Sequence, residues 1–241
     1  GFLLDRMDNR LDFTACFVIA LVGMALSMLF MGLTREPADE QKSITQPSRT
    51  PWLEWRDLLQ KDRNFSSFLL VRILWQFSTM GFAFYIVFGL RRFGMDEVTA
   101  GFLTAAMTIT QTVANVLMGW LGDRLGHRAM MIAGSAAVVL SSLLAWGAQS
   151  IAWLYPVIIL SGFANVAYWT IGIAITMEFG SEEKRPTYIG LSNTLVAPFT
   201  ILAPLLGGWI ADAHGLQTTF LLSAVGGVVI TLLLFWLVRD P

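Results

Sequence analysis

The chain has 241 residues, of which 55% are hydrophobic and 14% are charged, and its formal net charge is −1. Soluble domains usually carry about a quarter charged residues, so this composition is typical of a protein surrounded largely by lipid. The charge balance offers no basic surplus of the kind that nucleic-acid binding requires, and we expect no nucleic-acid partner. The single cysteine, Cys16, cannot form an intrachain disulfide and is interpreted as a small apolar side chain.

Seven apolar runs are long enough to cross the hydrocarbon core of a bilayer, which takes about 20 helical residues. They cover residues 13–33, 65–90, 98–121, 129–147, 151–177, 188–210 and 218–238. Because lipid offers the backbone no hydrogen-bond partners, each run is predicted to be helical. The expected fold class is all-α, a polytopic transmembrane helix bundle.

A long polar connection divides the chain into three expected parts: residues 1–33, with the first helix and its preceding loop, a linker at 34–64, and six helices at 65–241. The linker changes character at Pro51, a favoured first helical position. From there Trp52, Trp55 and Leu58 share one face of a short helix, which is predicted to lie at the membrane interface. The alternative is a solvated linker with stray aromatic residues.

The distribution of basic residues predicts the topology. Eleven of the 16 Lys and Arg residues fall on the side of the long linker, and Arg6, Arg10, Arg91 and Arg92 fall on the opposite side. Cytoplasmic loops carry the excess of Lys and Arg, so the linker and the C-terminus are predicted to be cytoplasmic.

Two loop segments repeat. Residues 119–128 read GWLGDRLGHR and residues 208–217 read GWIADAHGLQ. Three predicted helices separate them, so the copies should face opposite sides of the membrane, as inverted three-helix repeats do. A third copy opens the chain, where Gly1 and Asp5 match Gly208 and Asp212, and the first helix thus corresponds to the last.

Residues 119–128 resemble the cytoplasmic signature loop of the major facilitator superfamily, and residues 182–193, EEKRPTYIGLSN, resemble the last cytoplasmic loop of that family. The resemblance assigns residues 13–33 as helix 6 and the other six runs as helices 7 to 12, so we expect the chain to lack helices 1 to 5. It implies a secondary active transporter of a small solute that works by alternating access, without a cofactor. It also implies a multi-pass protein of a bacterial cytoplasmic (inner) membrane. The expected partners are the solute, the lipid bilayer and the N-terminal half of the same transporter.

The signature loop has an expected role in gating. Asp123 precedes the helix predicted from residue 129, where its carboxylate could accept first-turn N–H groups. Arg124 and Arg128 could pair with carboxylates or helix C-termini, and Gly119 and Gly126 could allow close approach. The alternative is a plain turn with charges held at the interface. The gating residues expected on the resemblance are Gly119, Asp123, Arg124, Gly126, Arg128, Arg185 and Asn193.

Polar residues in three helices are candidates for solute binding, because the resemblance places helices 7 and 10 at the central cavity. A charge in lipid is costly, so Arg72 requires an explanation, and it shares a helical face with Gln76 and Thr79. Arg72 could bind an anionic solute or a carboxylate of the absent half. The alternative is that it snorkels to the lipid headgroups.

The other candidates are Gln111 and Asn115 in helix 8, and Asn165, Tyr168 and Trp169 in helix 10. Hydrogen bonding between helices would explain the helix 8 pair equally well, and an aromatic pair is often simple packing. In helix 11, Pro198 and Pro204 are expected to bend the helix or to free carbonyls.

Two other function classes were compared with a transporter. A membrane enzyme would need clustered His, Asp, Glu or Cys, but no metal-ligand spacing occurs, so the chain is predicted not to be an enzyme and to hold no metal. The second alternative is a non-transporting membrane scaffold or remnant, because half a cavity cannot alternate its access.

Overall fold

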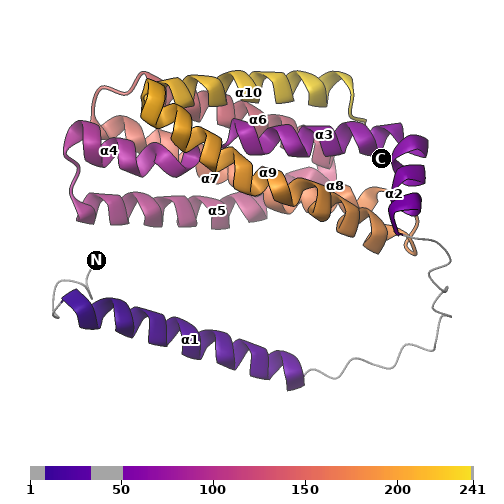
Figure 1. The fold of residues 1–241 in the computed structure, drawn as a ribbon, viewed down its shortest axis with the longest axis horizontal. Helices are drawn as coiled ribbons and strands as arrows, with labels where there is room; N and C mark the ends of the chain where they lie inside the picture. The colour runs from indigo at the N-terminus through magenta and orange to yellow at the C-terminus, as the bar shows by residue number, and fades with distance from the viewer. Residues whose placement is uncertain (1–8, 34–50, 240–241) are drawn as a thin grey trace. The chain divides into compact units, whose positions relative to one another are not determined.

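The structure is a computed structural model that describes residues 9–33 and 51–239. The chain separates into two compact units, Gly1–Pro51 and Trp52–Pro241. The described part of the first unit is the apolar helix α1 (Asn9–Leu33), and the second unit is a helical bundle (Figure 1). The part of the predicted linker at residues 34–50 lies outside the described residues.

Six helical segments of the described chain are long and apolar enough to cross a membrane. They are Arg63–Phe93, Glu97–Leu125, His127–Trp146, Ile151–Glu178, Arg185–His214 and Leu216–Trp236, and the shorter stretch Phe17–Leu33 is also apolar. They coincide with the runs predicted from the sequence. The predicted all-α transmembrane bundle is therefore confirmed.

The predicted short helix is present as α2 (Pro51–Lys61). Its residues Trp55, Leu58 and Leu59 pack against the core of the bundle. The side chain of Asp62 then caps the next helix by accepting the Phe65 N–H at 2.9 Å. Trp55, Leu58 and Leu59 of α2 are thus partly covered by the bundle.

The run predicted as one helix at 65–90 is interrupted. It consists of α3 (Arg63–Ser78), the 3₁₀ turn η1 (Phe82–Phe84) and α4 (Tyr85–Phe93). Ser223 of α10 (Leu216–Trp236) stabilises the interruption, because its Oγ accepts the Gly81 N–H at 3.1 Å and its carbonyl accepts the Ser78 hydroxyl at 3.2 Å. A side chain at Gly81 would displace the Ser223 hydroxyl, since an added Cβ would lie 2.9 Å from the Ser223 Oγ.

The run predicted at 151–177 is also irregular. It consists of the 3₁₀ turn η2 (Ile151–Trp153), α7 (Leu154–Val166), the π-helical segment η3 (Ala167–Ile171) and α8 (Gly172–Glu178). α6 (His127–Trp146) approaches η3 very closely, because a Cβ added at Gly134 would lie 2.1 Å from the Cβ of Ala167. Such π segments occur frequently at functional sites.

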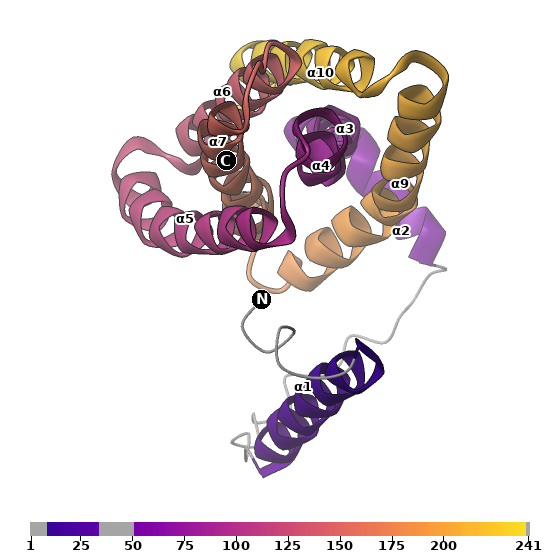
Figure 2. The same ribbon diagram turned by 90° about the vertical axis from the view of Figure 1, so that its left-hand side faces the viewer.

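Helices α3 and α4 form the middle of the bundle. Figure 2 looks along them and shows α10, α6, α7, α5 (Glu97–Leu125) and α9 (Arg185–His214) arranged around them. α3 packs on α9 and α10, and α6 packs on α10 and α7. α9 continues as one helix through Pro198 and Pro204, so the prolines do not break it.

The sequence repeat has the same backbone geometry in both copies. α5 and α9 each end one residue before a glycine, and the next helix begins one residue after it. Gly126 has φ 89° and ψ 142°, and Gly215 has φ 89° and ψ 155°. A positive φ is readily accessible to glycine, so the repeated glycines permit these one-residue connections. The predicted repeat thus corresponds to a repeated turn.

Candidate functional site

A cavity of about 230 Å³ lies beside the interruption between α3 and α4 and the π segment η3. Its lining residues are Trp75, Gln76, Thr79, Phe82, Ala83, Asn165, Tyr168 and Trp169. Most of the solute-binding residues predicted in helices 7 and 10 are therefore brought together around one cavity.

Two of the polar residues in this cavity are held by short hydrogen bonds. Gln76 Nε2 donates to Tyr168 Oη at 2.6 Å, which links α3 to the π segment. Thr79 Oγ1 donates to the Trp75 carbonyl at 3.0 Å, within the turn that ends α3. Since Tyr168 Oη accepts from Gln76, its own hydrogen remains available for another acceptor.

Arg72 lies beneath this cavity wall and is only 2% exposed. Its Nη1 donates to Ser192 Oγ of α9 at 2.7 Å, and its Cζ lies 5.2 Å from the centre of the Tyr168 ring. The guanidinium is therefore held inside the bundle, and the snorkelling alternative does not describe this conformation. Sequence reasoning missed Ser192, because a serine in a helix gives no signal of its partner.

The two candidates of helix 8 do not line the cavity. Asn115 Oδ1 accepts the hydroxyl of Thr170 at 2.6 Å, and Asn115 Nδ2 donates to the Gln111 carbonyl of its own helix at 2.8 Å. These contacts fit the interhelical alternative for Asn115.

The two arginines of the signature loop contact different kinds of group, and only Arg128 makes a contact of the expected kind. Arg128 donates from Nε to the Leu234 carbonyl at 3.0 Å and from Nη2 to the Phe235 carbonyl at 2.7 Å, at the C-terminus of α10. Arg124 stacks on Trp120, with its Cζ 4.0 Å from the ring centre. The predicted pairing of a loop arginine with a helix C-terminus is thus present at Arg128.

Two details predicted for this loop are wrong. Asp123 does not cap the following helix, because it lies in the last turn of α5 and the N-cap position of α6 is Gly126. Gly119 makes no close approach to any described residue, since none lies within 4 Å of a Cβ added there. The tight position is Gly122, where an added Cβ would lie 2.9 Å from the His127 ring.

A hydrogen bond joins the signature loop to the end of α8. His127 Nδ1 lies 2.6 Å from Glu178 Oε1, a contact that no sequence pattern indicates. The other two gating candidates are on the surface: Arg185 lies 3.8 Å from Glu182, and Asn193 is exposed.

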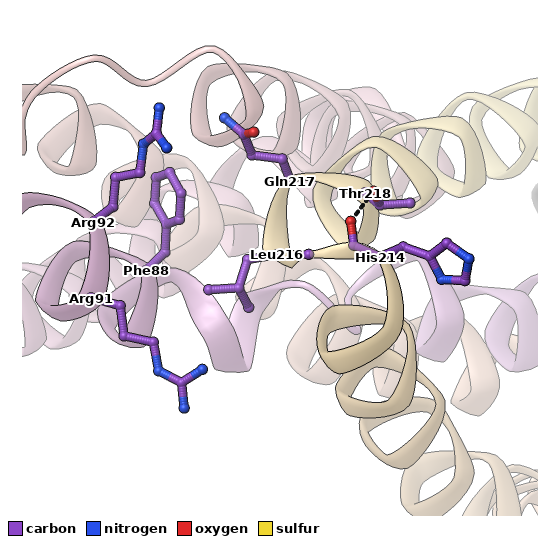
Figure 3. A pocket seen from close by; sticks show the side chains of 8 residues that line it. Phe88, Arg91, Arg92, His214, Leu216, Gln217 and Thr218 are labelled. Atoms are coloured by element: carbon purple, nitrogen blue, oxygen red, sulfur yellow. Dashed lines mark hydrogen bonds between the residues drawn. The ribbon is translucent and has the colours of Figure 1, made fainter.

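A second cavity, of about 330 Å³, lies between the end of α4 and the loop joining α9 to α10 (Figure 3). Arg91 and Arg92 point in different directions there, and the His214 ring points away from both (Figure 3). These groups do not converge on one point. The cavity beside η3 is therefore the better candidate site.

Comparison with known proteins identifies the family. The model of the Major Facilitator Superfamily matches residues 89–241, which is more than half of the chain. The chain belongs to the major facilitator superfamily. The match covers the region that contains the signature loop, as the resemblance predicted. The superfamily and the relatives below are membrane transporters, so the chain is an integral, multi-pass membrane protein and not an enzyme.

Several curated superfamily proteins are similar over part of the chain. Multidrug resistance protein fnx1 of Schizosaccharomyces pombe is 29% identical over 140 residues, covering 58% of this chain and 26% of the relative. Monocarboxylate transporter 12-B of Danio rerio is 26% identical over 152 residues, covering 59% and 31%. The efflux pump PmrA of Streptococcus pneumoniae is 31% identical over 125 residues, covering 51% and 31%. The matches thus span about a third or less of these relatives.

Two solved superfamily structures share the fold. The nucleoside transporter NupG superposes with a TM-score of 0.68 at 18% identity, covering 96% of this chain and 66% of NupG. The Escherichia coli fucose:proton symporter FucP also gives 0.68, at 16% identity, covering 98% and 60%.

The Arg128 contact allows a test of the signature loop in this superfamily member. Replacing Arg128 with alanine should free the last turn of α10, because the Leu234 and Phe235 carbonyls lose their donors. Amide exchange at the end of α10 should accelerate by roughly tenfold, since hydrogen bonds to charged groups contribute about 1.5–3 kcal/mol. Hydrogen–deuterium exchange measures this. Arg124→Ala, which loses only the contact with Trp120, is the control, and equal acceleration in both variants would contradict the assignment.

Proposed function

We propose that this chain supplies the C-terminal half of a secondary active carrier that moves a small solute by alternating access. The observation that carries the proposal is the cavity at the two helix irregularities, lined by Gln76, Thr79, Asn165, Tyr168 and Trp169. Carriers of this kind bind their solute near the bilayer midplane, between two halves. In this proposal the cavity is the half-site contributed by the C-terminal bundle.

The helix irregularities support this role. Non-helical backbone at membrane depth is tolerated only where it is covered by protein or lines a water-filled space. The η1 turn contributes Phe82 and Ala83 to the cavity, and η3 contributes Tyr168 and Trp169. Both helix irregularities therefore border the cavity.

The facing wall of the solute site is proposed to come from an N-terminal half, of which residues 13–33 form helix 6 and whose helices 1 to 5 are not in this chain. The length of the relatives supports this, because FucP is matched over only 60% of its chain. The distribution of Lys and Arg supports a cytoplasmic C-terminus, which is proposed together with a bacterial cytoplasmic membrane.

The contacts of the signature loop are proposed to act as the cytoplasmic gate. Arg128 ties α6 to the end of α10, and the His127–Glu178 pair ties α6 to the end of α8. Contacts that form in one conformation and break in the other bias the equilibrium between them. The names of the relatives do not select a solute, since they include multidrug, monocarboxylate, nucleoside and fucose carriers.

Cysteine accessibility tests alternating access. In a Cys16→Ser background, a cysteine at Ala83, an exposed residue of the cavity, should react with a membrane-impermeant maleimide from either side of the membrane. Val225→Cys, on an exposed face of α10, is the control and should be shielded by lipid. Labelling of the Ala83 position from one side only, under all conditions, would contradict the proposal and favour a non-transporting scaffold.

A further inference from the structure

Arg72 is a buried cation without a counter-charge among the described residues. Within the described membrane spans, it is the one charged side chain more than three residues from a helix end. Its bonded partner is the neutral hydroxyl of Ser192, and its Nε is buried without any hydrogen-bond partner. A buried charge is costly unless it is paired, so this arrangement lacks an anion.

A second unpartnered donor lies one helical turn away. The Nε1 of Trp75, a residue 1% exposed, is also buried without a partner. The rings of Trp75 and Tyr168 are 5.8 Å apart, and the guanidinium of Arg72 lies 5.2 Å from the centre of the same Tyr168 ring. Tyr168 therefore contacts both residues that carry an unsatisfied N–H group, and it also lines the cavity.

The Nε of Arg72 lies near the start of α8, where a Cβ added at Gly172 would lie 3.9 Å from it. Glycine has no side chain to offer, so this side of the guanidinium remains without an acceptor. A ligand oxygen would satisfy it.

We propose that Arg72 binds the carboxylate group of the transported solute. This inference rests on the proposed carrier function and gives the chemical class of its solute, a monocarboxylate. Within the described spans a single charge on the ligand matches the single buried cation, whereas a phosphate dianion would leave a negative charge unpaired in this half of the site. Guanidinium groups also match the planar, two-oxygen geometry of a carboxylate.

Tyr168 lines the cavity and also contacts the guanidinium of Arg72. The hydrogen bond from Gln76 holds its hydroxyl in this position. Because Tyr168 belongs to the π segment, a local change of that segment would move the ring relative to the guanidinium. The conformation described here is the one in which the arginine is covered.

Matched pairs of acids and amides test the inference. The purified native protein in lipid nanodiscs is incubated with lactate, benzoate or salicylate, and separately with lactamide, benzamide or salicylamide, at constant ionic strength and pH 7. The readouts are the midpoint of thermal unfolding and tryptophan fluorescence. At least one acid should raise the midpoint more than its amide does. Arg72→Gln should weaken the binding of that acid by roughly tenfold to a hundredfold, the usual cost of a lost charge-assisted contact.

Two further variants sharpen the test. Arg72→Lys keeps the charge but loses the Nε donor and the planar group, so it should restore only part of the affinity. Arg91→Gln removes an exposed arginine outside this site and should bind the acid as the wild type does.

The inference is overturned if no acid exceeds its amide, or if Arg72→Gln binds the acid unchanged. A carboxylate side chain from elsewhere in the protein could supply the same chemistry. In that case Arg72→Gln should lower the midpoint without any added anion and no acid should protect the wild type, which also overturns the inference. The two proposals can also fail separately. If an acid raises the thermal midpoint only when Arg72 is present, but the Ala83→Cys variant is not labelled from both sides, anion binding is upheld and alternating access is refuted.

Discussion

Replacing Gly134 with leucine should prevent the bundle from folding stably. A Cβ at this position would lie 2.1 Å from the Cβ of Ala167, 3.6 Å from its Cα and 3.4 Å from the ring of Trp75. Neither the backbone nor the buried indole can move aside easily, so α6 must separate from the π segment. Overpacking of a buried contact usually costs about 1–3 kcal/mol, and a leucine at such a distance should cost at least the upper value.

The measurement is the thermal unfolding midpoint of the purified protein, together with the amount of monodisperse protein recovered from membranes. Gly101→Leu is the matched control, because Gly101 is also a helical glycine and nothing lies within 4 Å of a Cβ added there. That variant should be neutral or slightly stabilised, since leucine favours helix by nearly 1 kcal/mol over glycine. If the Gly134 variant were as stable as this control, the close approach of α6 to η3 would be incorrect.

Replacing Ser192 with alanine should lower the free energy of unfolding by about 2–3 kcal/mol, although the change removes a single oxygen atom. Ser192 Oγ accepts from Arg72 Nη1 at 2.7 Å, and both residues are almost fully buried. Without it, a second N–H group of a buried cation would lack an acceptor. Denaturant unfolding of the protein in mixed micelles measures the change.

Ser161→Ala provides the comparison for this prediction. Ser161 is 1% exposed, and its hydroxyl donates to the Ile158 carbonyl of its own helix. Its removal should change stability by less than about 0.5 kcal/mol, because that carbonyl keeps its backbone bond. The effect of Ser192→Ala should also vanish in an Arg72→Leu background, where no cation remains. A persistent effect there would show that the serine acts through packing rather than through the arginine.

The positions of the helices could be predicted from the sequence because lipid imposes one simple constraint, a run of apolar residues in helical conformation. The interruption after Ser78 and the π segment at Ala167–Ile171 could not be predicted in this way, because neither contains a proline. Gly81 is only a weak sequence signal of the interruption. The interruption depends on a tertiary contact, since the Gly81 N–H group binds Ser223 of α10, 142 residues away.

The candidate site was predictable to a different extent. The polar faces of two helices correctly indicated which residues gather at one cavity, since Gln76 and Asn165 both line it. Partners were not predictable, because Arg72 is joined to Ser192 across 120 residues and His127 to Glu178 across 51. The error at Asp123 has a local cause: α5 runs to Leu125, beyond the apolar run predicted at 98–121, so the aspartate lies inside a helix end.

The side chain of Asn64 binds both backbone groups of Arg239, donating to its carbonyl and accepting its N–H, each at 2.9 Å. The beginning of α3 is thereby clamped to the segment that follows α10. At its other end α3 is separated from α4 by the turn at Thr79–Gly81. α3 is thus held at its N-terminal end, and the helical path is interrupted at its C-terminal end. A movement of α4 would therefore change the angle at the Thr79–Gly81 turn beside the cavity, while the start of α3 stayed in place.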